Sequence, residues 1–108
     1  MQRDFMTPTR DAARVLGQQI AATRRRQRRT AAEIAERAGI TRQTLRRVER
    51  GDPTVALGIA FEVATVLSLP LFGAEPRQLA ELAAEGERDL ALLPTRVDAT
   101  VEDVDDEF

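Results

Sequence analysis

Five of six consecutive residues in the first half of the chain are arginines, and their guanidinium groups can bind phosphates and other anions. They are Arg24, Arg25, Arg26, Arg28 and Arg29. The formal net charge of the 108 residues is only −2, but residues 1–50 hold 13 Arg against 5 acidic residues, whereas residues 51–108 hold 3 Arg against 13. The two halves therefore carry net charges of +8 and −10. This asymmetry predicts a basic surface that binds a polyanion and an acidic segment that has another function.

The side chains that most enzymes use for proton transfer or nucleophilic attack are absent. The chain has no His, Cys, Tyr or Lys, and Ser68 is its only serine, so carboxylates and threonine hydroxyls are the groups left for catalysis. A carboxylate hydrolase or a divalent-metal site needs acids in fixed geometry, but the acids crowd into 98–107, where little apolar core could hold them. We therefore expect no enzyme, no cofactor and no metal site, and a carboxylate enzyme or metal binder stays only as the third hypothesis.

The absence of Cys also bears on the cellular compartment. Without Cys the chain has neither disulfides nor a thiolate metal site, which suits a reducing compartment. The first residues, MQRDFMTPTRD, lack the apolar segment of a secretory signal, and no stretch approaches the roughly 18 apolar residues of a membrane span. The sequence therefore predicts a cytoplasmic protein.

The composition favours one compact helical domain. With 43% hydrophobic residues but only 4 Phe and no Trp or Tyr, the core must be built from Ala, Leu, Val and Ile, and small aliphatic packing favours helices. Apolar periodicity and capping residues predict an all-α chain with helices at about 9–28, 31–38, 42–50, 55–67 and 77–91. The expected N-caps are Thr7 or Thr9, Thr30 in a capping box with Glu33, Thr41 and Thr54, while Gly39 and Gly51 end helices and Pro76 starts the last one.

Residues 30–51 combine a helix, a glycine-containing turn and a second helix. Ala35 lets the two helices approach, Gly39 permits a left-handed turn, and Leu45 and Val48 fix the crossing against the first helix. These requirements are met at consistent spacing and predict a helix-turn-helix. The alternative is a plain helical hairpin.

Over about residues 16–72 the sequence resembles the helix-turn-helix family of the phage repressors and Cro, often called the XRE family. The motifs that carry the resemblance are Ile-x-x-x-Arg at 20–24, Ile34-Ala35, Ala38-Gly39-Ile40 and Val48-Glu49-Arg50-Gly51, followed by the Leu/Ala-rich fourth helix. Within the family it is most similar to the HipB-type antitoxins, in residues 41–44, 51–54 and 92–96.

The resemblance implies a compact five-helix, repressor-like helix-turn-helix domain with an extended acidic C-terminal tail. The expected organisation is an N-terminal lead over 1–8, the DNA-binding domain over 9–72, a C-terminal helix over 73–93 that serves as a dimer or partner element, and an acidic tail over 94–108 that is disordered when free.

The resemblance also implies that the third helix enters the major groove of double-stranded DNA. Carried over by position, Arg42, Gln43 and Arg47 would read base edges, because Arg forms two hydrogen bonds with guanine and Gln two with adenine; the alternative for each is a solvated polar position. Contacts to phosphate would come from Arg28, Arg29, Thr41, Thr44 and Arg46 and would set register without reading sequence.

One position departs from the family pattern. The family usually has Gln at the first position of the second helix, where it contacts phosphate, but this chain has Ala31. Arg28 or Arg29 would replace that contact. The family also often pairs an Arg of the first helix with a Glu near the end of the third, which implies a partly buried, structural ion pair between Arg24 and Glu49.

Family operators are two-fold symmetric, so the resemblance implies a homodimer. The expected interface is formed by apolar residues of the fourth helix, of Leu69–Phe72 and of the fifth helix. The alternative is that these residues belong to a monomer core.

Three interpretations are open for residues 94–108: a solvating tail, an intramolecular competitor that screens the DNA-binding face, and a segment that folds on a basic partner. In the third, Val97, Val101, Val104 and Phe108 are apolar anchors between carboxylates. The HipB resemblance favours the third and implies a HipA-like serine/threonine kinase toxin as partner. The first hypothesis is therefore an antitoxin that represses its own operon, and the second is a stand-alone transcriptional repressor without a toxin.

Overall fold

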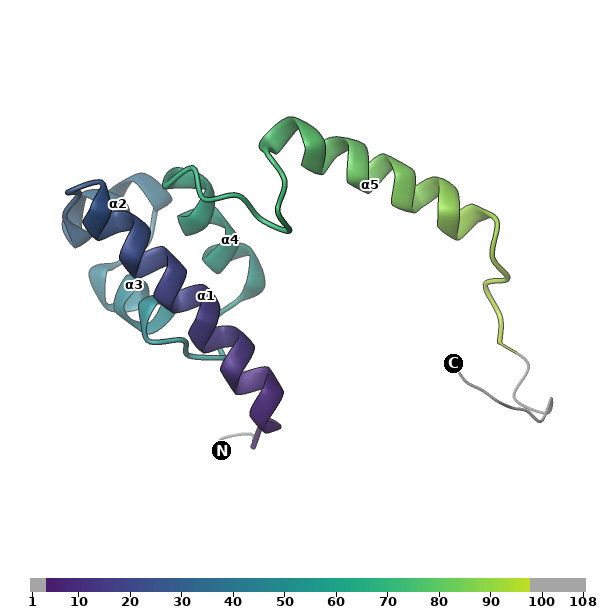
Figure 1. The fold of residues 1–108 in the computed structure, drawn as a ribbon. Coiled ribbons are helices and arrows are strands. Elements are labelled where there is room, and N and C mark those ends of the chain that lie inside the picture. The colour runs from purple at the N-terminus through teal and green to yellow at the C-terminus, as the bar shows by residue number, and fades with distance from the viewer. Residues whose placement is uncertain (1–3, 98–108) are drawn as a thin grey trace. The chain divides into compact units, whose positions relative to one another are not determined.

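The computed structural model of the chain describes residues 4–97, and within that range it has five helices and no strand (Figure 1). The helices are α1 (Thr7–Arg26), α2 (Ala31–Ala38), α3 (Arg42–Glu49), α4 (Leu57–Val66) and α5 (Pro76–Ala91). The expected all-α class with five helices is confirmed. The chain divides into two units, residues 1–73, which hold α1 to α4, and residues 74–108, which hold α5.

The core of the first unit consists of small aliphatic side chains, as the composition requires. Ile20, Ile34 and Val63 have no exposed surface, and Leu45 and Leu67 are 1% exposed. Each of α1 to α4 contributes to this core, α2 packs against α3 and α4, and α1 packs against α3. Burial of each of these side chains contributes roughly 1.5–3 kcal/mol before the entropic cost of ordering, so the four helices hold one another in place.

The N-termini of α2 and α3 are capped by threonine hydroxyls, as predicted, but the expected capping box at Thr30 is incomplete, because the Glu33 carboxylate contacts Arg29 and not the Thr30 N–H. Thr30 Oγ1 accepts the backbone N–H of Glu33 at 3.1 Å, and Thr41 Oγ1 accepts that of Thr44 at 3.0 Å. Each hydroxyl satisfies one of the backbone donors that a helix leaves free at its start. The Glu33 carboxylate turns to Arg29, with 3.4 Å between Oε2 and Nε.

The C-termini of α1 to α4 are closed by a residue in the left-handed backbone region. The φ angles of Gly39 and Gly51 are +73° and +77°, and Arg28 and Ser68 both adopt +59°. Behind α1, for example, the N–H of Arg29 donates to the carbonyl of Arg24 at 3.1 Å, which closes the last turn. The two glycine endings were predicted, whereas those at Arg28 and Ser68 were not, because neither residue type favours positive φ.

Three expected helix boundaries were wrong. α1 starts at Thr7, and the residue at its N-cap position is Met6, which makes no capping hydrogen bond. Neither Thr7 nor Thr9 is therefore the N-cap. It ends at Arg26 rather than near residue 28, because Arg28 leaves the helical region. α4 starts at Leu57 behind Ala56, because the expected cap Thr54 bonds to Asp52 instead.

In the second unit α5 starts at Pro76, where the missing N–H of proline costs no hydrogen bond. The backbone N–H of Glu75, just before the helix, donates to Oε1 of Gln78 at 2.8 Å. No residue of α5 is buried; Leu82 and Leu90 are 48% and 68% exposed. This helix therefore presents leucines on its surface.

Candidate nucleic-acid interface

The turn between α2 and α3 is held by backbone hydrogen bonds. The N–H of Ile40 donates to the carbonyl of Ala35 at 2.9 Å, and that of Gly39 donates to Glu36 at 3.1 Å. Thr41 then caps α3 after only two residues outside helix. The short turn fixes α3 relative to α2, which is what a helix-turn-helix requires.

α3 divides into a buried face and an exposed face. Leu45 and Val48 are 1% and 4% exposed and lie in the core. Arg42, Gln43 and Arg46 are exposed, so two of the expected base readers and one expected phosphate contact lie on the free side of the helix. Thr41 and Thr44, also expected at phosphate, have hydroxyls 3.0 Å apart at the N-terminus of α3.

Arg24 and Glu49 lie together and form a two-pronged ion pair between α1 and the end of α3. Nε of Arg24 is 2.7 Å from Oε2 of Glu49, and Nη2 is 3.2 Å from Oε1. The side chains are only 14% and 13% exposed. The hydrogen bond that Arg24 donates to Glu49 raises the pKa of Arg24 against the opposing effect of burial. The pair therefore fixes the C-terminal end of α3 to α1 in the charged state.

Two glycines make this contact between α1 and α3 possible. A Cβ atom on Gly17 would lie 2.8 Å from the carbonyl oxygen of Glu49 and would overlap that of Val48, and a Cβ on Gly51 would lie 2.5 Å from Cα of Arg14. Neither position tolerates a side chain without movement of backbone. Gly17 was not singled out from the sequence, although a glycine inside a helical apolar stripe is a signal for close packing.

Arg47, the third expected base reader, is held by the loop that follows α3. Its Nε donates to Oδ2 of Asp52 at 2.9 Å, and its Nη2 donates to Oγ1 of Thr54 at 3.0 Å. The other carboxylate oxygen of Asp52 accepts the N–H and the hydroxyl of Thr54 at 2.9 and 2.7 Å. Sequence reasoning gave Asp52 and Thr54 no part in the site.

The carboxylate of Asp52 is stabilised in its charged form. The hydroxyl of Thr54 lowers the pKa of Asp52 most, followed by the Thr54 backbone N–H and by Arg47, and together they bring it to about 2. Asp52 is therefore an anion at neutral pH.

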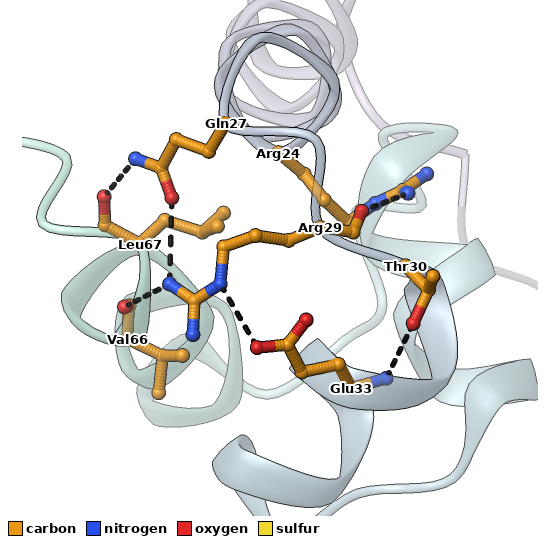
Figure 2. A network of polar contacts seen from close by, with 7 residues as sticks. All are labelled: Arg24, Gln27, Arg29, Thr30, Glu33, Val66 and Leu67. Carbon is orange, nitrogen blue, oxygen red and sulfur yellow. Dashed lines mark hydrogen bonds and ion pairs between the residues drawn. The ribbon is translucent and has the colours of Figure 1, made fainter.

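Arg29 occupies a polar network at the turn between α1 and α2 (Figure 2). Its Nη1 is 3.4 Å from the carbonyl oxygen of Val66 and 3.4 Å from Oε1 of Gln27. The amide Nε2 of Gln27 donates in turn to the carbonyl of Leu67 at 2.8 Å. The Arg29 side chain is 22% exposed. These contacts satisfy carbonyls that the end of α4 leaves free.

The remaining arginines of this region are more accessible than Arg29. Arg25, Arg26 and Arg28 are exposed at the end of α1, and Arg28 is therefore the member of the expected phosphate pair with the freer side chain. Ala31, at the position where the family usually has Gln, packs against the core instead.

Of the expected partner-binding residues in the tail, the structure describes only Val97, which is 88% exposed. Val101, Val104 and Phe108 lie outside the described residues. Between residues 4 and 97, no cluster of three or more acidic side chains could hold a metal ion. No helix in that same range is long and apolar enough to cross a membrane.

Comparison with known families agrees with this geometry. The search of curated proteins and the search of solved structures gave no significant match. A family model described as helix-turn-helix matches residues 20–72, a range that includes the last third of α1, all of α2 to α4 and both partners of the Arg24–Glu49 pair. Residues 20–72 are therefore similar to helix-turn-helix domains, in agreement with the geometry of α2 and α3.

Proposed function

We propose that the chain is a sequence-specific transcriptional repressor that binds double-stranded DNA through α3. The observation that carries the proposal is the exposed polar face of α3, where Arg42 and Gln43 project from a helix fixed by the Arg24–Glu49 pair and by its buried face. An α-helix fits the major groove, where Arg and Gln distinguish guanine and adenine by pairs of hydrogen bonds. Arg47 joins them as the third reader.

Contacts to phosphate orient the domain on the duplex. Thr41 and Thr44 lie at the N-terminus of α3, where the helix dipole favours an anion, and Arg46 extends from the same helix. Arg28 supplies the contact that Ala31 cannot make. Arg29, which the sequence also placed at phosphate, serves mainly to close the end of α4, because the network around it occupies its Nε and Nη1 donors.

The repressor acts as a homodimer in this proposal, since two recognition helices then reach two half-sites about one helical turn apart. Apolar surface in the first unit supports an interface near α4. Leu57 is 67% exposed and Phe72 is 78% exposed, and the rings of Phe61 and Phe72 meet edge to face with centroids 5.9 Å apart. Large exposed apolar side chains that lie close together are typical of association surfaces.

The test starts from enrichment of a random-sequence duplex library by the full-length protein, followed by affinity measurements on the enriched duplex and on a scrambled duplex. We expect a two-fold symmetric consensus and binding that falls by orders of magnitude between about 50 and 200 mM salt. Arg42→Ala should weaken binding to the consensus by about 1–3 kcal/mol and spare the scrambled duplex. Arg77→Ala on α5 is the matched control. Equal loss on both duplexes would refute a reading role for Arg42.

The finer proposal is that the repressor is the antitoxin of a type II toxin-antitoxin pair, with a HipA-like kinase toxin as partner. Besides the HipB resemblance, it is supported by α5, which exposes Leu82 and Leu90 among acidic residues and buries none of its own, and by Leu93, which is exposed just after the helix. Such a surface fits a basic partner. Deletion of residues 95–108 should leave DNA binding intact and abolish capture of a kinase encoded next to this gene. If the truncated chain still captures that kinase, the tail is not the binding segment.

A further inference from the structure

Arg47, which lies about one helical turn after Arg42 and Gln43, already has hydrogen-bond partners within the protein. Its guanidinium carries five N–H donors arranged along three edges. The edge formed by Nε and Nη2 is occupied by Asp52 and Thr54, at 2.9 and 3.0 Å. Both N–H groups of Nη1 and one of Nη2 remain, and these form an edge that can still bond two acceptors side by side, as guanine O6 and N7 present them.

The loop that holds Arg47 is itself fixed. The backbone N–H of Asp52 donates to the carbonyl of Arg47 at 3.0 Å, so the two residues are joined by the main chain as well as by side chains. Gly51 between them adopts φ +77° and packs against the backbone of Arg14. Oδ1 of Asp52 is held by two hydrogen bonds from Thr54, which leaves Oδ2 directed to Arg47.

We propose that Asp52, braced by Thr54, is a specificity-determining residue that positions Arg47 for one guanine and keeps it from binding phosphate indiscriminately. The inference rests on the proposed function of α3 as the reading helix. A guanidinium held in one rotamer loses less conformational freedom when it binds a base than a free one does. The carboxylate beside it also cancels much of its attraction to the phosphate backbone, which is the sequence-independent part of DNA affinity.

Asp52→Asn is the informative substitution, because the carboxamide oxygen can still accept the Thr54 N–H while the charge and one acceptor for Arg47 are lost. The matched control is Glu62→Gln, which removes the same charge from an exposed position on α4. Thermal unfolding of both variants separates loss of positioning from loss of the fold. Arg47→Ala identifies the base pair that depends on Arg47.

The experiment compares library enrichment and duplex affinities for the wild type and these three variants. In the wild type we expect a guanine at the pair that Arg47→Ala randomises. Asp52→Asn should reduce the preference for that guanine about tenfold, within the range of one bidentate contact, and should raise affinity for a scrambled duplex, with a salt dependence steeper by up to about one unit. In the Arg47→Ala background Asp52→Asn should change neither quantity.

Each other outcome overturns a distinct statement. If the wild type enriches no sequence, the proposed function fails and this inference falls with it. If it enriches a consensus that Arg47→Ala leaves unchanged, or if Asp52→Asn keeps the guanine preference within twofold of wild type, DNA reading stands and the role of Asp52 is wrong. If Glu62→Gln has an effect equal to that of Asp52→Asn, Asp52 acts through its charge alone, and the proposal that it positions Arg47 is wrong.

Discussion

Asp52 makes stability depend on pH in a predictable direction. Its pKa is lowered from 3.8 to about 2 in the folded protein, first by the Thr54 hydroxyl. The unfolded chain therefore binds this proton more tightly, and the contribution of Asp52 to stability, fully present above about pH 5, is lost as the pH falls toward 2. We expect urea unfolding of wild type and Asp52→Asn to differ at pH 7 and to converge toward pH 2. Parallel pH profiles would contradict this assignment.

The pH profile of stability can also show whether Thr54 or Arg47 contributes more to the low pKa of Asp52. Because the hydrogen bond from the Thr54 hydroxyl lowers the pKa of Asp52 more than the hydrogen bond from Arg47 does, we expect Thr54→Val to remove more of the pH dependence than Arg47→Ala. The reverse order would mean that the ion pair, rather than the loop, holds the carboxylate in its charged form.

The Arg24–Glu49 pair should be the most costly ion pair to break. With both side chains about seven-eighths covered, loss of one partner leaves a charge that water reaches poorly, at a cost of about 3 kcal/mol. Arg24→Ala and Glu49→Ala should each lower the free energy of unfolding by about that amount, and the double variant by clearly less than the sum. The exposed pair Asp11–Arg14, at 56% and 62% exposure, is the control and should contribute under about 1 kcal/mol. Strict additivity at Arg24 and Glu49 would show that the pair has no stabilising energy.

Residue types and spacing predicted that Arg42 and Gln43 are exposed, but not that Arg47 and Arg29 have hydrogen-bond partners within the protein. Arg42 and Gln43 follow a capping threonine and alternate with buried Leu45 and Val48, so helical periodicity alone places them outside. In the sequence, residue type and helical spacing do not distinguish Arg47 and Arg29 from Arg42 and Gln43, so they predict an exposed side chain for all four. What distinguishes them are partners brought close by the turn after α3 and by the end of α4, and such contacts depend on tertiary geometry that no local pattern encodes.

At the scale of helices, the same division between local and tertiary causes explains which ends were predictable. Thr30, Thr41 and Gly39 act through bonds within three or four residues, and sequence placed all of them correctly. Thr54 failed as a cap because the Asp52 carboxylate competes for its hydroxyl and its N–H. Arg28 and Ser68 take a left-handed conformation that their residue types disfavour, so packing of α1 and α4 decides where those helices stop.

The approach of α1 to the end of α3 depends on Gly17. In Gly17→Ala the new Cβ would meet backbone oxygens of Val48 and Glu49, and because backbone cannot move aside cheaply, we expect a loss of about 3 kcal/mol in unfolding free energy. Gly58→Ala on α4 is the matched control, since nothing lies within 4 Å of its added Cβ. That change should be neutral or stabilise by up to about 1 kcal/mol.

DNA binding by the two glycine variants shows whether the helix contact matters for function. If α1 positions α3, Gly17→Ala should weaken binding to the enriched duplex even at temperatures where circular dichroism shows it folded. Full stability of Gly17→Ala would mean that α1 and α3 can separate without cost, which would contradict the tight contact.

For the whole molecule, the opposite charges of the two halves of the sequence also separate the two units, although by a smaller difference. Residues 1–73 hold 13 Arg and 7 acids, a net charge of +6, and residues 74–108 hold 3 Arg and 11 acids, a net charge of −8. Because like charges repel at long range, the acidic unit should oppose attraction of the whole chain to DNA. This field acts on any sequence and so reduces indiscriminate binding.

Neutralising the tail tests this effect without truncation. Replacing Glu102, Asp103, Asp105, Asp106 and Glu107 by their amides changes the net charge from −2 to +3. Affinity for a scrambled duplex should then rise several-fold at about 50 mM salt, and the gain should nearly vanish near 0.5 M, where screening acts within a few ångströms. The free energy of unfolding should stay within about 0.5 kcal/mol of wild type. A gain that persisted at high salt would instead indicate a specific contact that the carboxylates had blocked, and would favour the tail as an intramolecular competitor for the DNA-binding face.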